Sequence, residues 1–201
     1  GRGMTTTGLT RRDALALALA ALPPAAWAQQ DWPGKPVRLV VPFPPGGTTD
    51  TVTRLVGTEI AKPLGQPVVV ENKPGAGTVI GVDMVAKSTD GHSFVTVANS
   101  FCANVTLIKK LPYDAVRDLR PVALMGMSEH VLATHLGSGL KSMDDLRKLV
   151  KSRPDAVSYA SFGNGTSAHL SGEMLAQALG VKLLHVPYKG QAPALADLLG
   201  G

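Results

Sequence analysis

The first loop that could do chemistry is Pro-Phe-Pro-Pro-Gly-Gly-Thr-Thr-Asp, residues 42–50. Its prolines and glycines exclude a regular strand or helix. Thr48, Thr49 and Asp50 are good N-cap residues, and apolar side chains at helical spacing follow them. Such a loop presents backbone N–H groups at a helix N-terminus, which favours an anion through hydrogen bonds and the helix dipole. Because no Gly-Lys-Ser/Thr follows, it is not a Walker A loop.

Two further loops have a similar character. Residues 98–100 follow an expected strand, and residues 161–167 (Ser-Phe-Gly-Asn-Gly-Thr-Ser) form a polar, glycine-rich turn onto an expected helix. Each loop alone is also what a tight turn with an N-cap looks like. Two similar loops, one in each expected domain, favour a cleft, in which the second loop would hold a second carboxylate or the other end of the same ligand. The candidate ligand-binding residues are Pro45, Gly46, Gly47, Thr49, Asp50, Asn99, Ser100, Ser161, Gly163, Asn164, Gly165, Thr166 and His169.

Catalytic and metal-binding patterns are thin. The five histidines are dispersed without a His-x-x-x-His pair, so no metal site is expected. Ser161 or Ser167 with His169 and a distant acid could form a hydrolase triad, but there is no Gly-x-Ser-x-Gly elbow. His169 would either face the cleft or pack against its own loop. The glycines at 75, 77 and 81 miss the dinucleotide fingerprint by one place, and no cofactor is expected.

The elements that would position these loops alternate between strand and helix. Strands are expected at residues 37–41, 68–71 and 93–98, with helices from about 48 to 63 and from 78 to 87. This alternation predicts a parallel sheet covered on both faces. Residues 121–125 and 131–133 are expected to be strands that cross between domains, and a helix follows the possible capping box at Ser142.

The alternation then restarts with a strand at 157–160, a helix at 167–179, a strand at 183–186 and a helix at 191–199. We therefore expect two α/β domains, residues 29–130 and 131–201. A sheet of two strands seldom stands alone, so the second domain is expected to be incomplete and the natural chain to continue past Gly201.

Residues 1–28 have the pattern of a cleavable export signal. Arg11 and Arg12 precede an apolar run at 14–22, two prolines follow, and Ala26-Trp27-Ala28 offers small residues where signal peptidase reads. The arginine pair suggests the twin-arginine route. About nine apolar residues are too few to span a bilayer, which needs about 20. This pattern predicts a secreted protein.

Composition narrows the class further. The 201 residues are 44% hydrophobic with a formal charge of +5, and removal of residues 1–28 leaves 17 basic and 14 acidic residues. The basic residues are scattered, so a nucleic-acid surface is not expected. Cys102 is the single cysteine, which excludes an internal disulfide, and it is expected to be a small buried residue.

Several motifs together resemble the tripartite tricarboxylate transporter substrate-binding proteins, or Bug receptors. The similar segments follow in the family's order between Trp32 and Gly201, at residues 35–50, 65–77, 110–114, 159–161, 163–166, 169–170 and 185–190. The resemblance implies a type II periplasmic-binding-protein-like α/β fold, with mainly parallel sheets in two domains and a cleft at the hinge.

The resemblance also implies a function. It implies a monomeric binding protein, not an enzyme, that captures a small carboxylate for the membrane subunits of a tripartite transporter. Residues 44–50 and 163–167 would hold the ligand through amides, hydroxyls and ordered water. Two alternatives stay open, an exported serine hydrolase and a receptor that presents its ligand to a sensor kinase.

Overall fold

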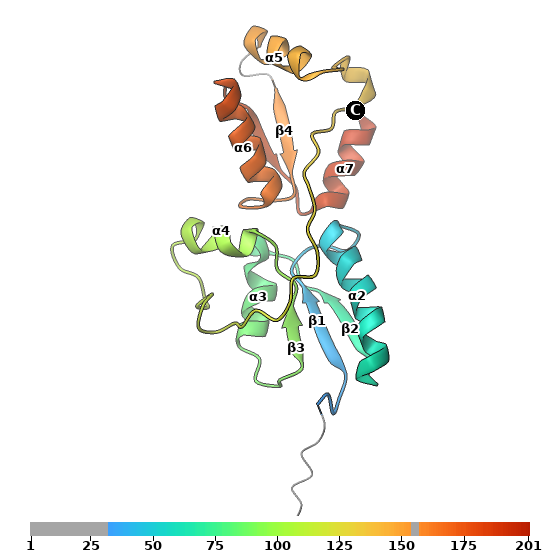
Figure 1. Ribbon diagram of the computed structural model, residues 1–201. Helices are drawn as coiled ribbons and strands as arrows, with labels where there is room; N and C mark the ends of the chain where they lie inside the picture. Colours follow the sequence, from blue (N-terminus) through green and yellow to red (C-terminus); the bar gives the residue numbers. More distant parts are fainter. Residues whose placement is uncertain (1–31, 154–156) are drawn as a thin grey trace, which may run out of the picture. The chain divides into compact units, whose positions relative to one another are not determined.

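The structure, a computed structural model, describes residues 32–153 and 157–201 (Figure 1). The expected export signal, residues 1–28, lies outside the described residues. Residues 33–201 form one compact unit with two sheets, and the expected domain boundary at residue 130 stays a prediction. Within the described ranges, no helix has both the length and the apolar character needed to cross a bilayer.

The first sheet is parallel and has the order β2-β1-β3. It consists of β1 (Val37–Val41), β2 (Val68–Asn72) and β3 (Ser93–Val95), which confirms the three expected strands, although β3 is shorter than predicted. Central strand β1 is buried on both faces, because Val40 and Val41 have no exposed surface and point in opposite directions. The β-branched run at 37–41 is therefore the middle of the sheet.

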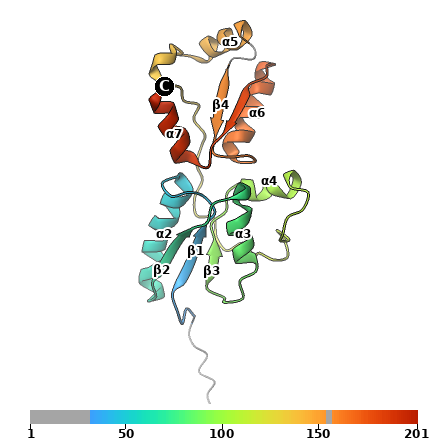
Figure 2. The ribbon, with the colours of Figure 1, turned by 180° about the vertical axis from the view of Figure 1, so that it is seen from behind.

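Two helices cover the two faces of this sheet (Figures 1 and 2). Helix α2 (Thr48–Leu64) packs closely at Gly57, where an added Cβ would lie 3.4 Å from Leu39 Cδ1. Helix α3 (Val79–Ala86) packs at Gly81, where an added Cβ would lie 2.9 Å from Pro42 Cβ. Positions 39 and 42 point to opposite faces of an extended chain, so each face of the sheet receives one helix.

The second sheet pairs β4 (Ser158–Ser161) in parallel with β5 (Leu184–Pro187). Its helices are α6 (Ser167–Leu179) and α7 (Gln191–Gly200), close to the predicted bounds. Before them, α5 (Met143–Ser152) begins with the Ser142 hydroxyl accepting the Asp145 N–H, as the capping pattern predicted.

The two strands predicted in the middle of the chain are absent from the described structure. Residues 121–125 and 131–133 are not strands, and Val122, Leu124 and Val131 are 76%, 79% and 87% exposed. No strand in the described ranges pairs with them, and an apolar run forms a strand only where a neighbour satisfies its backbone. Short 3₁₀ turns, η1 (Ala76–Thr78) and η2 (Leu136–Ser138), were also not predicted.

Helix α4 (Ser100–Leu107) was missed as well, and it explains a wrong prediction for Cys102. Ser100 and Asn104, four residues apart, point inward, so Cys102 between them is exposed. Asn104 Nδ2 donates to Gly77 O at 2.7 Å and to Thr78 Oγ1 at 3.3 Å. These bonds anchor α4 to the turn before α3.

The start of α2 differs from the prediction, and its end agrees with it. Helix α2 is capped at Gly47 without a side-chain bond, so Thr48, Thr49 and Asp50 form its first turn and are not its cap. Gly65 ends this helix with φ of +63°, and Pro63 lies in its last turn, as expected.

Candidate ligand-binding site

A cavity of about 400 Å³ lies where the strand-to-helix loops meet. Its lining comes from four such loops and from the extended segment 128–133, and comprises Phe43, Pro44, Gly47, Thr48, Thr49, Ala98, Asn99, Ser100, Ser128, Glu129, His130, Val131, Ala133, Phe162, Thr166, Ser167, Gln191 and Leu195. In the first sheet the contributing loops leave β1 and β3, neighbours whose chains continue to different helices. Ligands of open parallel sheets bind at such a switch point.

The loop between β1 and α2 is held by Asp50. Its Oδ2 accepts the Gly46 N–H at 2.9 Å, and Gly46 has φ of +86°. Asp50 is 4% exposed and also accepts from Arg54 Nε at 3.1 Å and from Asn72 Nδ2 at 2.8 Å. Burial alone would raise the pKa of the Asp50 carboxyl, but the hydrogen bonds from Arg54, the Gly46 amide and Asn72 lower it to about 2. Asp50 is therefore a charged support for the loop.

The loop between β4 and α6 is held by His169. Its Nδ1 accepts the Gly165 N–H at 3.1 Å, and Gly165 has φ of +74°. The His169 ring stacks on His185 with centroids 4.1 Å apart, and His185 stacks on Tyr159 at 5.0 Å. Burial lowers the pKa of His185, the neighbouring His169 lowers it further, and Glu173 partly opposes both. His169 therefore packs behind its loop and does not face the cavity.

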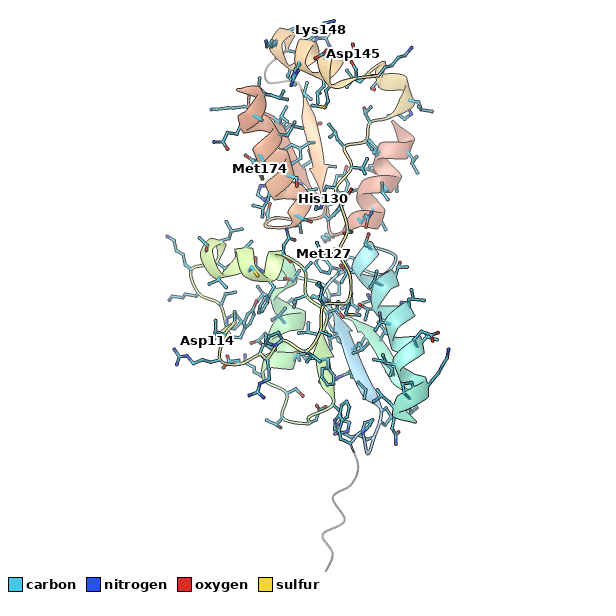
Figure 3. The ribbon with its side chains drawn as sticks, viewed as in Figure 1. Asp114, Met127, His130, Asp145, Lys148 and Met174 are labelled. Carbon is cyan, nitrogen blue, oxygen red and sulfur yellow. The ribbon has the colours of Figure 1, made fainter. Side chains whose placement is uncertain are left out.

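Both serines of the hydrolase hypothesis form a hydrogen bond with a histidine, but neither does so with His169. Ser161 Oγ lies 2.6 Å from His185 Nε2, and Ser161 has no exposed surface. Ser167 Oγ lies 2.7 Å from Nε2 of His130, which is labelled in Figure 3 and belongs to the extended segment. In the described part of the chain, no carboxylate hydrogen bonds to His130. A triad needs such a group to orient its histidine.

The electrostatics of the cavity come mainly from the backbone. The first turns of α2, α4, α6 and α7 all contribute to the lining. No lysine or arginine is among the described lining residues, and Glu129 is their one carboxylate. Four helix N-termini provide partial positive charge and N–H donors without a basic side chain.

One side chain in this cavity has an unmet hydrogen-bonding requirement. Ser100, the first residue of α4, is 1% exposed, and its hydroxyl has no hydrogen-bond partner among the described residues. A buried hydroxyl without a partner costs free energy, so an acceptor supplied by a ligand would relieve that cost.

The cavity brings together some of the predicted residues. Gly47, Thr49, Asn99, Ser100 and Thr166 line it. The other eight do not, namely Pro45, Gly46, Asp50, Ser161, Gly163, Asn164, Gly165 and His169. Which of the thirteen contact a ligand stays a prediction.

Sequence reasoning missed the extended segment 128–133 and the start of α7. The segment carries no periodic pattern that would place it at a cavity. Gln191, in contrast, follows a strand and begins a helix, so the rule that selected the other loops could have selected it too.

Among the described residues, no three His, Cys, Asp or Glu side chains are grouped so as to hold a metal ion.

Comparison with known proteins shows which family the chain resembles. The family model described as "Tripartite tricarboxylate transporter family receptor" matches residues 52–201. The protein BugT of Bordetella pertussis is 40% identical over 173 residues, which cover 85% of this chain and 53% of BugT. The chain thus spans about half the length of that curated relative.

Two solved structures share the fold and were determined with carboxylates. The R. palustris protein Rpa4515 with adipate has a TM-score of 0.80 and 35% identity, over 84% of this chain and 57% of that one. MatC (Rpa3494) from Rhodopseudomonas palustris with bound malate has a TM-score of 0.72 and 34% identity, over 83% of this chain and 57% of that one. The expected periplasmic-binding-protein fold and the resemblance in the motifs are confirmed, and the chain belongs to the tripartite tricarboxylate transporter receptor family.

Proposed function

We propose that this chain belongs to an exported solute receptor that captures a small carboxylate in the cavity described above. The observation that carries the proposal is the convergence of four helix N-termini, from α2, α4, α6 and α7, on one cavity without lysine or arginine. Uncharged donors of this kind suit an anion that must later be released, because they bind it without a buried ion pair.

The ligand class is a small dicarboxylate. The relatives solved with malate and with adipate support this class, since both ligands carry a carboxylate at each end. The cavity has donors from the α2 and α4 side and donors from the α6 and α7 side, one set for each end of such a ligand. Its volume of about 400 Å³ is within the range of small-molecule sites. Glu129 disfavours additional negative charge.

The receptor acts by binding and not by chemistry. It collects its ligand in the periplasm as a monomer, closes around it and delivers it to membrane subunits of a tripartite transporter. Membership of the receptor family supports the transport role. Presentation of the ligand to a sensor kinase would use the same cavity and the same closure.

Ester hydrolysis is a second candidate, because Ser167 Oγ and His130 Nε2 are 2.7 Å apart in the cavity. The acid that would orient His130 is missing among the described residues, so binding has the stronger support. Turnover of p-nitrophenyl acetate that is abolished by Ser167→Ala would favour hydrolysis.

Thermal unfolding with ligands tests the binding proposal. Malate and adipate are added to the purified protein, with the neutral diamide adipamide as the control. A ligand at 100 times its Kd adds about 2.7 kcal/mol to the free energy of unfolding, so Tm rises with the acid and not with the amide. Cooperative unfolding with no shift from either acid would contradict carboxylate capture.

A Ser100→Ala variant locates the site. Its hydroxyl has no hydrogen-bond partner in the described part of the chain, so the variant should unfold at the wild-type temperature or slightly above it. Its affinity for the acid should fall about five- to tenfold if the hydroxyl donates to a carboxylate. Unchanged affinity would remove Ser100 from the site.

A further inference from the structure

The side chain of Gln191 occupies the donor site at the start of α2. Gln191 Oε1 accepts two hydrogen bonds from one residue, from Thr48 N at 3.0 Å and from Thr48 Oγ1 at 2.8 Å. Both residues line the cavity. A single carbonyl oxygen therefore lies where a backbone donor and a hydroxyl donor converge, at the positive end of a 17-residue helix.

The backbone keeps Gln191 close to this position. An added Cβ at Gly190, which has φ of +140°, would lie 2.9 Å from Pro44 Cδ. An added Cβ at Gly47 would lie 3.7 Å from Gln191 Cβ. The start of α7 thus packs against the β1–α2 loop, and the Gln191 side chain has only a short distance to span.

The chemistry of this contact matches that of a ligand group. The Gln191 carboxamide presents the same sp² oxygen as a carboxylate, but without the charge. Ser100 also lines the cavity, and its hydroxyl has no acceptor among the described residues, so Gln191 does not satisfy all the donors there. A carboxylate has two oxygens and a full negative charge, and it would satisfy more donors with stronger hydrogen bonds.

We propose that Gln191 is a built-in competitor, whose side-chain oxygen stands in the free protein where one oxygen of the ligand carboxylate binds. This inference rests on the proposed carboxylate-binding function. A carboxylate must displace Gln191 from Thr48, so the affinity of the site is lower than its donors alone would provide. Residue 191 therefore sets how tightly the receptor holds its ligand and how readily it releases it.

Substitutions at Gln191 separate this role from a direct contact with the ligand. Gln191→Ala removes the competing oxygen, and adipate and malate should then bind about three- to tenfold more tightly, which corresponds to about one net hydrogen bond. Gln191→Glu places a permanent carboxylate on Thr48, and the affinity should fall at least about tenfold.

The experiment is isothermal titration of adipate and malate into wild type, Gln191→Ala and Gln191→Glu. Matched controls are Gln177→Ala and Gln177→Glu, because Gln177 is exposed on α6 and does not line the cavity. Both controls should bind the acids as tightly as wild type does. Gln177→Glu adds the same negative charge as Gln191→Glu, so it shows whether net charge alone changes the affinity. Gln191→Ser, whose side chain is too short to reach Thr48, replaces Gln191→Ala if the latter does not unfold cooperatively.

The outcomes are distinct. The competitor role is supported if Gln191→Ala binds the acids more tightly than wild type and Gln191→Glu binds them more weakly. It is also supported if Gln191→Ala binds the acids while binding by wild type is too weak to measure. Weaker or unchanged binding by Gln191→Ala, with wild type binding the acids, overturns the competitor and leaves carboxylate capture intact. No binding by any folded variant overturns both.

Discussion

The two loops that begin α2 and α6 have the same construction but different chemistry. In each loop a buried or half-buried side chain in the first turn accepts the N–H of the glycine four residues earlier, Asp50 from Gly46 and His169 from Gly165. Both glycines have positive φ. The first acceptor is a charged carboxylate, and the second is an imidazole nitrogen that can accept only when it is unprotonated.

The two loops show two ways to support a cavity whose described lining has no lysine or arginine. Asp50 carries a negative charge near the start of α2, and Arg54 pairs with it through Nη2 at 3.0 Å, so the charge is balanced outside the cavity lining. The His169 side uses stacked aromatic rings and introduces no negative charge. The two halves of the cavity thus keep similar geometry but differ in their response to mutation and to pH.

The largest expected effect comes from Asp50→Ala. The Gly46 N–H, Asn72 and Arg54 would lose a shared acceptor, so the free energy of unfolding should fall by about 2–4 kcal/mol, as measured by urea denaturation. Asp144→Ala is the matched control, because Asp144 also pairs with an arginine, Arg147, but at an exposed position. Equal losses in the two variants would show that the buried network adds nothing.

A smaller effect is expected from His169→Ala. The Gly165 N–H would lose its acceptor and His185 would lose one of its two stacking partners, so the free energy of unfolding should fall by about 1–2 kcal/mol. His135→Ala is the control, since its Nδ1 also accepts a backbone N–H at 3.1 Å, from Gly137, but at an exposed turn. If His169→Ala costs no more than His135→Ala, the two loops are not supported in equivalent ways.

The smallest effect is a response to pH between pH 7 and pH 5, which we expect from His185 on β5. His185, surrounded by Tyr159, Ser161, His169 and Glu173, has a pKa below its ordinary value of 6.5. The unfolded chain therefore binds the proton more readily than the folded chain does. The contribution of His185 to stability is fully present above pH 6.5 and is lost as pH falls below that value. Asp50, with its pKa lowered from 3.8 to about 2, keeps its contribution until pH falls below 3.8.

Thermal unfolding at pH 7 and pH 5 checks this assignment. Wild type and Asp50→Asn should lose Tm by a similar amount, whereas His185→Gln should lose less. The prediction fails if the loss in His185→Gln equals that of wild type.

Local sequence rules predicted some helices and strands of this protein and failed at others. The β-branched run at 37–41, the glycine after Leu64 and the spacing from Ser167 to Gly180 specify β1, the end of α2 and the whole of α6 by local rules. The same rules failed at residues 121–133, because an apolar run can be read as a strand or as an extended linker, and only a neighbouring strand decides between them.

The site divides in the same way. Local sequence was enough to predict that two glycine-rich loops begin helices, because Gly permits the positive φ of such turns and Ser and Thr favour the start of a helix. Tertiary structure alone decided that Asp50 and His169 turn inward to support those loops, and that Ser100, His130 and Gln191 meet at one cavity. The cavity joins residues far apart in the chain, so their distances depend on how the sheets and helices pack. Asp50 and His169 each bond a glycine only four residues away, but both also need a partner from another element, Asn72 for Asp50 and His185 for His169.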